Sequence, residues 1–452
     1  MVDRDLPKNY LEHIKDILGE NEFNEFHKFI MENEVKKSVT FNNKATTFFI
    51  NENLPEAKKV ELAEFGYYVP NNYKIGDSLL NHAGIIYSQD SSSMIPVELM
   101  GIEKGDFVLD LCAAPGGKSI QILNKLNNTG LLISNEIEYS RAKILFENIT
   151  RMGFKNSIIT NSDAKAFAKS ELMFDKILVD APCSGEGLIA KSKTIIDWKK
   201  EYIEPNAERQ LSILNDIKSS LKNGGVLVYS TCTFNTKENE EVVFKFLTQN
   251  PEFELVTPPE NFRKKLNEGI AISGKDMSCC LRCYPHKSNG SGQFVAVMKK
   301  KGEKQENKIT NIYKKKISLK EIKSIIEFLT NVLNEKNDLL DKLYKANNNI
   351  YILASELDCS PVKILCNGCV LGELSGNILK PNHCFFKKYG NEFKNKIELD
   401  DISAKRYVNG EQLEVDLNLK GYGVFLYKGF VLGGFKANNG RANNLYPKNL
   451  RG

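Results

Sequence analysis

The 452-residue chain contains no run of about 18 apolar residues, the length that a membrane-spanning helix requires. Its N-terminus also lacks the shorter apolar stretch of a signal peptide. Apolar residues make up 41% and charged residues 26% of the chain, proportions typical of a soluble globular protein. We therefore expect a cytoplasmic protein without a membrane partner, and at roughly 100 to 200 residues per domain the length predicts two or three domains.

A disulfide framework is not expected either, although the chain has ten cysteines. Chains of this length without an export signal normally keep their thiols reduced. Some of the cysteines are therefore candidates for chemistry rather than for cross-links.

The positive charge is concentrated in the last third of the chain. Residues 301–452 contain 25 Lys and Arg against 17 Asp and Glu, a net charge of +8, whereas residues 1–300 contain 37 against 40, a net charge of −3. Such a split often marks a segment that binds a polyanion, and a solvated lysine-rich face is an equally good interpretation of the charge alone.

The periodicity of apolar residues predicts an α/β architecture. Residues 7–33 carry apolar positions at helical spacing and predict one or two core-facing amphipathic helices. Between residues 108 and 297, short apolar runs alternate with helical stretches, which predicts βαβ units and a mostly parallel sheet covered on both faces. The expected strands are 107–111, 131–134, 157–160, 176–179, 226–230 and 294–298, and the expected helices lie near 117–126, 139–152, 206–222 and 237–248.

After residue 298 the pattern changes. Residues 299–320 are polar and charged with little apolar periodicity, which is typical of a linker. We expect a helix over 319–346, followed by a small, mostly β module with strands at 362–365, 370–374, 422–427 and 431–435.

The first predicted strand leads into a turn of small residues and then a helix. The turn reads Cys112-Ala113-Ala114-Pro115-Gly116-Gly117-Lys118. A tight turn before a helix N-terminus lets the backbone approach a cofactor closely and offers free N–H groups. The turn lacks the G-x-G-x-x-G spacing of a dinucleotide site and the Walker pattern of a nucleoside triphosphatase.

Acidic residues follow the next two strands. Glu136 comes after the second strand, where a carboxylate can accept hydrogen bonds from both ribose hydroxyls of a nucleoside. Asp163 comes after the third strand and could bind an adenine amino group, or could simply be the N-cap of the following helix. Because ligands bind at the carboxyl ends of strands in open α/β sheets, the common placement of the two acids favours binding roles.

Two cysteines and an aspartate follow the fourth and fifth strands, in the runs Asp180-Ala181-Pro182-Cys183 and Ser230-Thr231-Cys232. A single cysteine is most often a buried structural thiol, but two at adjacent strand ends indicate a site. A thiolate can add to carbon 6 of cytosine and so activate carbon 5, an otherwise poor nucleophile, for methylation. Lys118 is the candidate cation to stabilise the thiolate, and Asp180 is placed to hold the ring.

Three motifs carry a resemblance to a known family: Asp-Leu-Cys-Ala-Ala-Pro-Gly-Gly-Lys-Ser from residue 110, Asp-Ala-Pro-Cys-Ser-Gly-Glu-Gly from residue 180, and Ser-Thr-Cys-Thr-Phe from residue 230. They resemble the motifs of the Sun-type RNA cytosine-5 methyltransferases. The resemblance extends to segments 82–90 and 282–294 and so covers nearly all of residues 1–300. The ending, 440–451, is similar to that of bacterial RsmF-type enzymes, which carry a PUA-like RNA-binding module.

This resemblance implies a Rossmann-like methyltransferase sheet with a small α/β N-terminal domain and a mostly β, PUA-like C-terminal module. The implied domains are an N-terminal RNA-binding or support domain at 1–100, a methyltransferase domain at 101–300, a linker at 301–320 and a basic RNA-binding module at 321–452. It implies S-adenosyl-L-methionine as the cofactor. It also implies Cys232 as the nucleophile and Cys183 as a thiol that helps to release the product. The residues implied in binding the cofactor or the base are Cys112, Ala113, Ala114, Pro115, Gly116, Gly117, Lys118, Glu136, Arg141, Asp163 and Asp180.

We expect no metal site. Cys279, Cys280 and Cys283 could be combined with Cys366 and Cys369 into a zinc site, but over eighty residues separate the two groups, against about 15 to 20 in a zinc ribbon. The two histidines within the family motifs, His82 and His286, have no partner evident in the sequence, and we interpret both as structural.

The resemblance predicts methylation of carbon 5 of a cytosine in structured RNA by a monomer acting through a covalent cysteine–carbon 6 intermediate. The predicted substrate is 16S ribosomal RNA or the small ribosomal subunit. The target base must be flipped out or lie in a loop, because it cannot be reached inside a helix. The same chemistry on transfer RNA or 23S ribosomal RNA is an alternative, and only the C-terminal module argues against it. A non-catalytic factor that binds ribosomal RNA is a second alternative, against which the intact Cys183 and Cys232 count.

Overall fold

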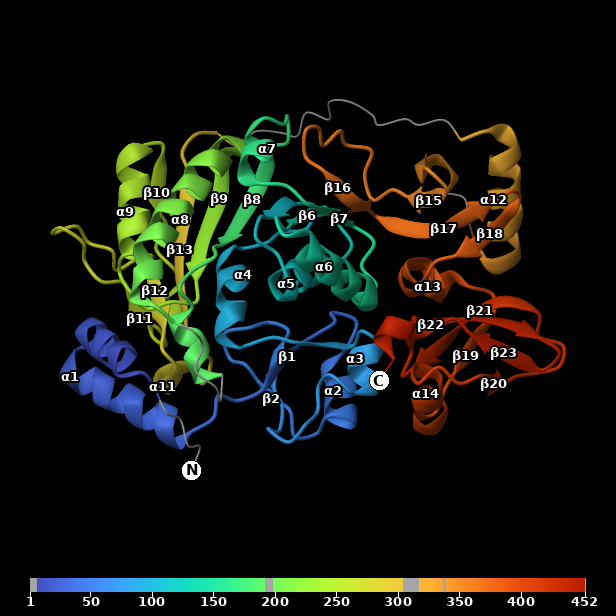
Figure 1. The fold of residues 1–452 in the computed structure, drawn as a ribbon, viewed down its shortest axis with the longest axis horizontal. Coiled ribbons are helices and arrows are strands. Elements are labelled where there is room, and N and C mark those ends of the chain that lie inside the picture. The colour runs from blue at the N-terminus through green and yellow to red at the C-terminus, as the bar shows by residue number, and fades with distance from the viewer. Residues whose placement is uncertain (1–5, 192–197, 304–316, 336–338, 452) are drawn as a thin grey trace.

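A ten-stranded sheet forms the centre of the protein (Figure 1). The structure is a computed structural model and describes residues 6–191, 198–303, 317–335 and 339–451. The strands of this sheet are β5 (Phe107–Asp110), β6 (Leu131–Asn135), β7 (Ser157–Thr160), β8 (Phe174–Asp180), β9 (Leu221–Thr231), β10 (Phe253–Leu255), β11 (Asn267–Glu268), β12 (Leu281–Cys283), β13 (Gln293–Lys300) and β16 (Ile364–Asn367). Their order is β11-β12-β13-β9-β8-β5-β6-β7-β16, with β10 paired to β13. The five strands from β9 to β7 pair in parallel, and β13 and β16 flank them in antiparallel orientation.

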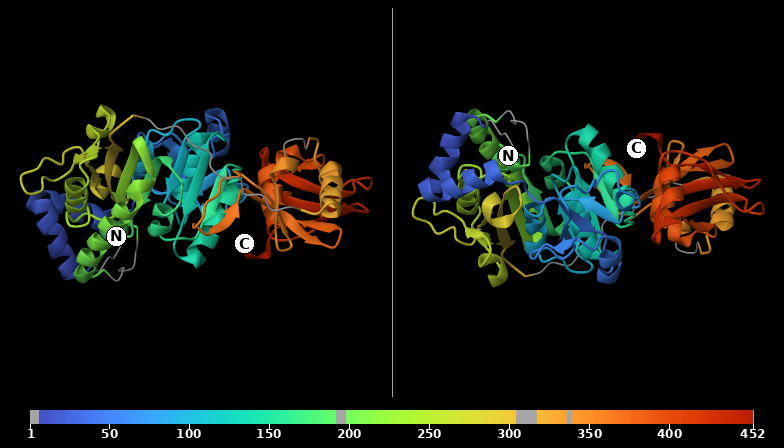
Figure 2. Two further views of the ribbon diagram at one scale, coloured as in Figure 1. Left: turned by 90° about the horizontal axis from the view of Figure 1, so that it is seen from above. Right: turned by 90° about the horizontal axis from the view of Figure 1, so that it is seen from below.

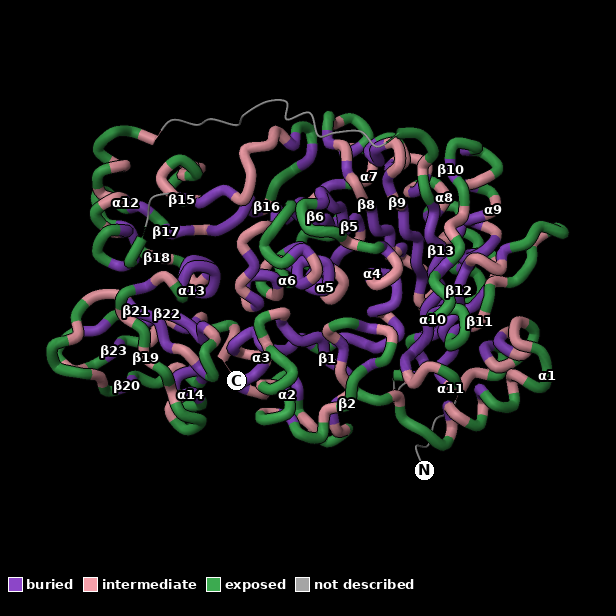
Figure 3. Tube along the Cα trace, turned by 180° about the vertical axis from the view of Figure 1, so that it is seen from behind, coloured by how far each residue is buried: buried purple, intermediate pink, exposed green. Residues whose placement is uncertain are grey.

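Helices cover both faces of this sheet, as the periodicity predicts. They are α4 (Ile95–Leu99), α5 (Gly117–Leu126), α6 (Tyr139–Met152), α7 (Ala164–Ala168), α8 (Ile203–Ile217), α9 (Glu240–Gln249), α10 (Glu260–Arg263) and α11 (Pro285–Ser288). Along β5, Phe107 and Leu109 pack in the cluster that contains α7, α8 and α9, whereas Val108 packs with α4, α5 and α6. Because successive side chains of a strand point to opposite faces, one strand supplies both cores. Figure 3 shows β8, β9 and β13 as largely buried.

The N-terminal part consists of a long helix and a small sheet. Its elements are α1 (Lys8–Glu32), β1 (Ser38–Phe41), α2 (Thr47–Asn53), β2 (Lys58–Lys59), β3 (Gly66–Tyr68), α3 (Leu79–His82) and β4 (Ile86–Ser88), and the sheet has the order β2-β3-β1-β4. Gly19 interrupts α1 with a φ of 74°, a conformation that glycine adopts without steric cost. The prediction of one or two amphipathic helices is therefore confirmed, and the buried face of α1 packs against Phe234 and Tyr284 of the central region.

The described C-terminal part contains three α-helices and two further sheets. Its elements are α12 (Leu319–Val332), β14 (Leu343–Ala346), β15 (Asn349–Ile352), β17 (Cys369–Ser375), β18 (Ile378–Pro381), α13 (His383–Tyr389), β19 (Lys396–Glu398), α14 (Asp401–Val408), β20 (Leu413–Glu414), β21 (Gly421–Tyr427), β22 (Phe430–Asn438) and β23 (Arg441–Asn444). The sheets have the orders β14-β15-β17-β18 and β19-β21-β22-β23-β20. Short 3-10 helices lie at Ser92–Met94, Glu186–Ala190, Lys200–Tyr202, Lys218–Ser220, Leu340–Lys342, Gly390–Glu392 and Lys448–Leu450.

The helix expected over 319–346 is wrong in its second half. It ends at Val332, and residues 343–346 form β14, which pairs with β15 in a hairpin. The turn of this hairpin contains Asn347 at a φ of 54°, and asparagine is one of the few residues that tolerate this left-handed conformation. The turn chemistry therefore overrides the helical spacing of the apolar residues in this segment.

The strand expected at 362–365 forms, as β16, but in a different sheet. It pairs in antiparallel orientation with β7, with Ile364 opposite Thr160 and Asn367 opposite Ile158 (Figure 1). Without it, β7 would be an edge strand with unpaired backbone groups. The C-terminal part thus completes the central sheet instead of forming only a module of its own.

The C-terminal part also packs on the N-terminal sheet, although the two are far apart in the sequence. Val39 and Ile85 share one buried apolar cluster with Tyr407 and Phe425. The ring of His82 forms a 2.8 Å hydrogen bond with the hydroxyl of Tyr446, which agrees with a structural role for this histidine. Figure 2 shows the C-terminal part at one end of an elongated molecule. Among the described residues, no helix is long and apolar enough to cross a membrane.

Candidate active site

The carboxyl ends of the parallel strands surround a cleft of about 500 Å³. Of the residues predicted for the site, eight line it: Cys112, Ala114, Glu136, Arg141, Asp163, Asp180, Cys183 and Cys232. They lie at or after the ends of five different strands, with Arg141 in the first turn of α6, and these strands share this edge of the sheet because they run in parallel. The structure therefore brings the predicted cofactor residues and both cysteines to one place.

The turn after β5 reaches the cleft through Cys112 and Ala114. Gly116, at its end, has a φ of 120°, and a β-carbon there would come within 3.1 Å of Leu145. Gly117 starts α5, as predicted. Glycine at position 116 is thus required both by the backbone and by the close approach of α6.

Glu136 and Arg141 form one unit with this turn. The side chain of Glu136 is only 4% exposed, and its Oε2 lies 3.3 Å from Nη1 of Arg141. Arg141 also donates from Nη2 to the carbonyl of Ala114 over 2.9 Å. The arginine therefore connects the acid after β6 to the turn after β5.

Asp163 is the N-cap of α7, and its predicted role in binding adenine stays a prediction. Its carboxylate accepts a 3.1 Å hydrogen bond from the N–H of Ala166 and so caps α7, and the residue also lines the cleft. N-capping uses one carboxylate oxygen and leaves the other free for a ligand.

The two cysteines lie in contact. The sulfur atoms of Cys183 and Cys232 are 3.2 Å apart, well beyond the roughly 2.05 Å of a disulfide bond. The N–H of Cys232 also donates to the sulfur of Cys183 over 3.4 Å. The hydrogen bond with Cys232, burial and the charge of Glu238 raise the pKa of Cys183 well above its usual range. Cys183 is therefore a thiol near neutral pH.

Asp180 is held by three donors at the edge of the cleft. It accepts from Lys118 Nζ over 2.8 Å, from the hydroxyl of Ser230 over 2.7 Å and from Nε2 of Gln293 over 3.1 Å. Its side chain remains 30% exposed. Among the described residues, Lys118 forms its ion pair with Asp180, and its predicted effect on a thiolate stays a prediction.

Some residues at this site were not anticipated from the sequence. Arg209 and Asp216 of α8 line the cleft, but in the sequence they look like the polar face of an amphipathic helix. Glu186 lies within a quoted motif without an assigned role, yet it accepts hydrogen bonds from the N–H groups of Phe234 and Asn235, just after Cys232. The signal available in the sequence was an acidic residue inside a family motif.

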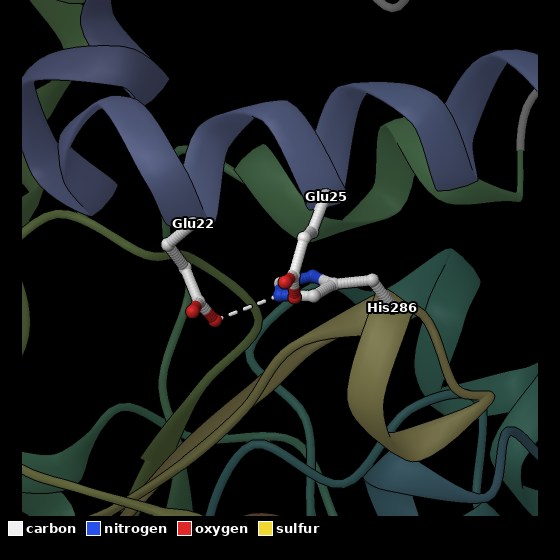
Figure 4. Close-up of side chains that lie close together, drawn as sticks. All are labelled: Glu22, Glu25 and His286. Carbon is white, nitrogen blue, oxygen red and sulfur yellow. Dashed lines mark hydrogen bonds and ion pairs between the residues drawn. The ribbon is translucent and has the colours of Figure 1, made fainter.

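A separate acidic cluster joins α1 to α11 (Figure 4). Glu22 and Glu25 lie beside His286, whose Nε2 is 2.7 Å from Oε1 of Glu22. Nζ of Lys287 contacts the same oxygen at 2.6 Å. Burial alone would raise the pKa of Glu22, but the hydrogen bonds and charges of Lys287 and His286 lower it. We interpret the cluster as a set of ion pairs that hold α1 against α11 and not as a metal site, because Lys287 already pairs with the Glu22 carboxylate.

The cysteine groups that resembled a zinc site lie far apart. Cys283 is in β12, next to one edge of the central sheet, whereas Cys366 is in β16 at the opposite edge. Neighbouring strands are about 4.8 Å apart, so this arrangement excludes a shared ion.

Known protein families match most of the chain. The model of the 16S rRNA methyltransferase RsmB/F family matches residues 97–299, that of the N-terminal domain of 16S rRNA methyltransferase RsmF matches 6–91, and that of the methyltransferase RsmF PUA domain matches 394–452. The ribosomal RNA small subunit methyltransferase F of Psychromonas ingrahamii is 32% identical over 397 residues, which are 83% of this chain and 81% of that protein. The chain belongs to the ribosomal RNA small subunit methyltransferase F family. Its relative from Shewanella piezotolerans is 29% identical over 416 residues, 86% of this chain and 84% of the relative.

Solved structures share the fold. A methyltransferase homologue from Pyrococcus horikoshii has a TM-score of 0.54 and 25% identity, covering 65% of this chain and 99% of that one. NSun6 from Pyrococcus horikoshii, solved with SFG, has a TM-score of 0.55 and 22% identity, covering 66% of this chain and 99% of that one. The predicted Rossmann-like methyltransferase fold and PUA-like module are confirmed. As a member of this family, the protein uses S-adenosylmethionine as its cofactor.

Proposed function

We propose that this protein methylates carbon 5 of a cytosine in 16S ribosomal RNA through a covalent intermediate on Cys232. The observation that carries the proposal is the pair of thiols in contact at 3.2 Å, which line the same cleft as Asp180 and the predicted cofactor residues. A methyltransferase that acts on a nucleophilic oxygen or nitrogen has no need of a thiol, whereas carbon 5 of cytosine must first be activated.

The cleft suits S-adenosylmethionine by its donor and acceptor set. Glu136 and Asp163 offer carboxylates to the ribose and the adenine, and the turn from Cys112 to Lys118 allows close backbone approach. Ala113, Pro115, Gly116 and Gly117 shape this turn. When bound, the cofactor would supply an electrophilic methyl group.

The residues of the chain perform the remaining steps. The Cys232 thiolate forms a bond from Sγ to carbon 6, and the electron pair of the 5,6 double bond moves to carbon 5 and the ring. Asp180, steadied by Lys118, holds the ring by accepting a hydrogen bond from the exocyclic amine, or from N3 once that nitrogen carries a proton. After methylation a base removes the proton of carbon 5, the electron pair re-forms the double bond, and the Sγ–carbon 6 bond breaks with Cys232 leaving as thiolate. Cys183 assists this release.

The choice of Cys232 as nucleophile agrees with the electrostatics of the pair. Because the pKa of Cys183 is raised, its S–H can donate to the sulfur of Cys232 and stabilise the thiolate there. The reverse assignment would place the thiolate on the sulfur that lies near the charge of Glu238.

The substrate class follows from the family and the charge. Relatives are named ribosomal RNA small subunit methyltransferases, and the PUA match falls in the basic part of this chain. We place the protein in the cytoplasm, where its proposed substrate is found. We also propose that it acts as a monomer. The domain division at residues 100, 300 and 320 stays a prediction, and β16 argues that 321–452 is not self-contained. Transfer RNA or 23S ribosomal RNA as the substrate, and a purely RNA-binding role, are the alternatives.

Methyl transfer to defined RNAs tests the proposal. The full chain is incubated with radiolabelled S-adenosylmethionine and transcripts of 16S ribosomal RNA, 23S ribosomal RNA or transfer RNA, alongside assembled small subunits. Bisulfite sequencing then locates 5-methylcytosine. We expect label in 16S ribosomal RNA, free or assembled, and none with Cys232→Ala. Label confined to another RNA would overturn the substrate, and RNA binding without label in any arm would favour the non-catalytic alternative.

A further inference from the structure

Glu238 lies in the segment between β9 and α9 and is completely buried, although no cation pairs with it among the described residues. One carboxylate oxygen, Oε2, accepts from the N–H of Ser184 and from Nε2 of Gln210, each over 2.9 Å. The other, Oε1, accepts from Nδ2 of Asn235 over 2.8 Å and from the hydroxyl of Ser184. Burial raises the pKa of Glu238, although these hydrogen bonds oppose the shift. Burying an acid without a paired cation costs free energy, which neutral donors offset only in part. We infer that the position of Glu238 has a role.

These hydrogen bonds hold both neighbours of Cys183. Ser184 is bound to the carboxylate directly, through its N–H and its hydroxyl. Gln210 of α8 uses the same Nε2 to donate to the carbonyl of Pro182 over 2.8 Å. The backbone on either side of Cys183 is therefore tied to Glu238.

A different carboxylate holds the loop of Cys232. Glu186 accepts from the N–H groups of Phe234 and Asn235 over 2.7 and 2.9 Å. The side-chain amide of Asn235 then donates to Glu186 Oε1 and to Glu238 Oε1 over 2.9 and 2.8 Å. The backbone of the Cys232 loop is thus held by Glu186, and the side chain of Asn235 links Glu186 to Glu238.

We propose that Glu238 is a positioning residue for Cys183, which keeps that thiol in contact with Cys232 and so supports the release of the methylated RNA. The inference rests on the proposed function. Glu186 holds the loop of Cys232 through two backbone N–H groups, whereas the Glu238 carboxylate contacts that loop through the side chain of Asn235. Loss of Glu238 therefore displaces Cys183 more than the attacking cysteine.

The variant Glu238→Gln tests this with little change in volume. The substitution replaces one carboxylate oxygen by an NH2 group, which is a donor. The two donors that bound that oxygen then lose their acceptor. With a radiolabelled 16S ribosomal RNA transcript and S-adenosylmethionine, we expect single-turnover methyl transfer at close to the wild-type rate. The covalent protein–RNA adduct should decay roughly tenfold to a hundredfold more slowly, as expected of a displaced group. A chase with unlabelled RNA followed by denaturing gels measures the decay.

Glu241→Gln is the matched control. It makes the same chemical change in the first turn of α9, where Glu241 pairs with Lys237 at the surface, and its adduct should decay as in the wild type. Gln210→Ala removes the bond to Pro182 and should slow decay in the same direction as Glu238→Gln.

Equal slowing of attack and release in Glu238→Gln, or an unchanged adduct lifetime in a variant with normal thermal unfolding, would overturn the inference. If instead the wild type methylates no RNA and Cys183→Ala forms no adduct, the proposed function itself fails, and the inference fails with it.

Discussion

The sulfur atoms of Cys183 and Cys232 are in contact, and the two possible choices of nucleophile have different consequences. If Cys232 is the nucleophile, Cys183→Ala still forms the bond to carbon 6 and transfers the methyl group, and then stalls as a covalent adduct. Cys232→Ala forms no adduct and loses several orders of magnitude in rate, because the activated nucleophile is gone. Denaturing gels of each variant with 16S ribosomal RNA and cofactor distinguish them. An adduct with Cys232→Ala but not with Cys183→Ala would reverse the assignment.

Asp110, at the end of β5, makes the stability of the fold depend on pH. It is fully buried and accepts a 2.7 Å hydrogen bond from the hydroxyl of Ser119, and its other oxygen has no hydrogen-bond partner among the described residues. Burial raises its pKa from 3.8 to about 7, although the hydrogen bond from Ser119 opposes the shift. The folded state therefore binds more protons than the unfolded chain between these values.

The free energy of unfolding contributed by Asp110 should fall as pH rises from about 4 to about 7, and then level off. Asp110→Asn keeps the shape and the acceptor for Ser119 but does not titrate. Urea unfolding of both proteins across this range should show Asp110→Asn gaining stability relative to the wild type as pH increases. A constant difference between the two curves would mean that Asp110 does not titrate in this window.

At the scale of elements, one glycine connects the central sheet to the C-terminal sheet. Gly368 lies between β16 and β17, has a φ of 74° and donates its N–H to the carbonyl of Ser157. A β-carbon there would come within 2.3 Å of the Ile352 carbonyl oxygen and 2.4 Å of the Ala354 nitrogen. Backbone atoms cannot move aside as a flexible side chain can, so the junction between the two sheets has room only for glycine.

Gly368→Ala should lower the free energy of unfolding by more than the roughly 1–2 kcal/mol of left-handed strain alone. Gly376→Ala is the matched control, because Gly376 has a φ of 61° but no atom near the position of a β-carbon. Urea titrations followed by circular dichroism compare the two. Equal losses in the two variants would show that the backbone around β16 relaxes and that the junction is not rigid.

At the scale of the whole molecule, the C-terminal part is both a support and a candidate RNA-binding surface. Deleting residues 303–452 would remove β16 and expose the edge of β7, so weaker RNA binding after truncation would not distinguish these roles. Neutralising exposed bases leaves the packing intact. Three bases are exposed there: Lys428 in the loop before β22, Lys436 in β22 and Arg441 in β23.

Replacing these three bases with Gln should weaken RNA binding and reduce the steepness of its salt dependence by roughly one unit for each phosphate that is no longer bound. Lys264→Gln, an exposed base in the central part, is the control and should leave the slope unchanged. Binding titrations at several salt concentrations measure the slope. An unaltered slope in the triple variant would mean that this part of the +8 charge is only a solvated face.

Local signals in the sequence determined the parallel sheet and the edge at which the predicted site residues meet. Strands that are buried on both faces of a parallel sheet must be apolar runs, and helical stretches connect them. Because the loops after parallel strands share one edge of the sheet, the sequence by itself placed Glu136, Asp180 and both cysteines together. Only the tertiary structure decided that β16 completes the central sheet, that Lys118 pairs with Asp180, and that Glu238 holds the loop of Cys183. Such interactions join segments that lie 54 or more residues apart through hydrogen bonds and sheet edges, and no local pattern of residues encodes which partner a buried polar group will find.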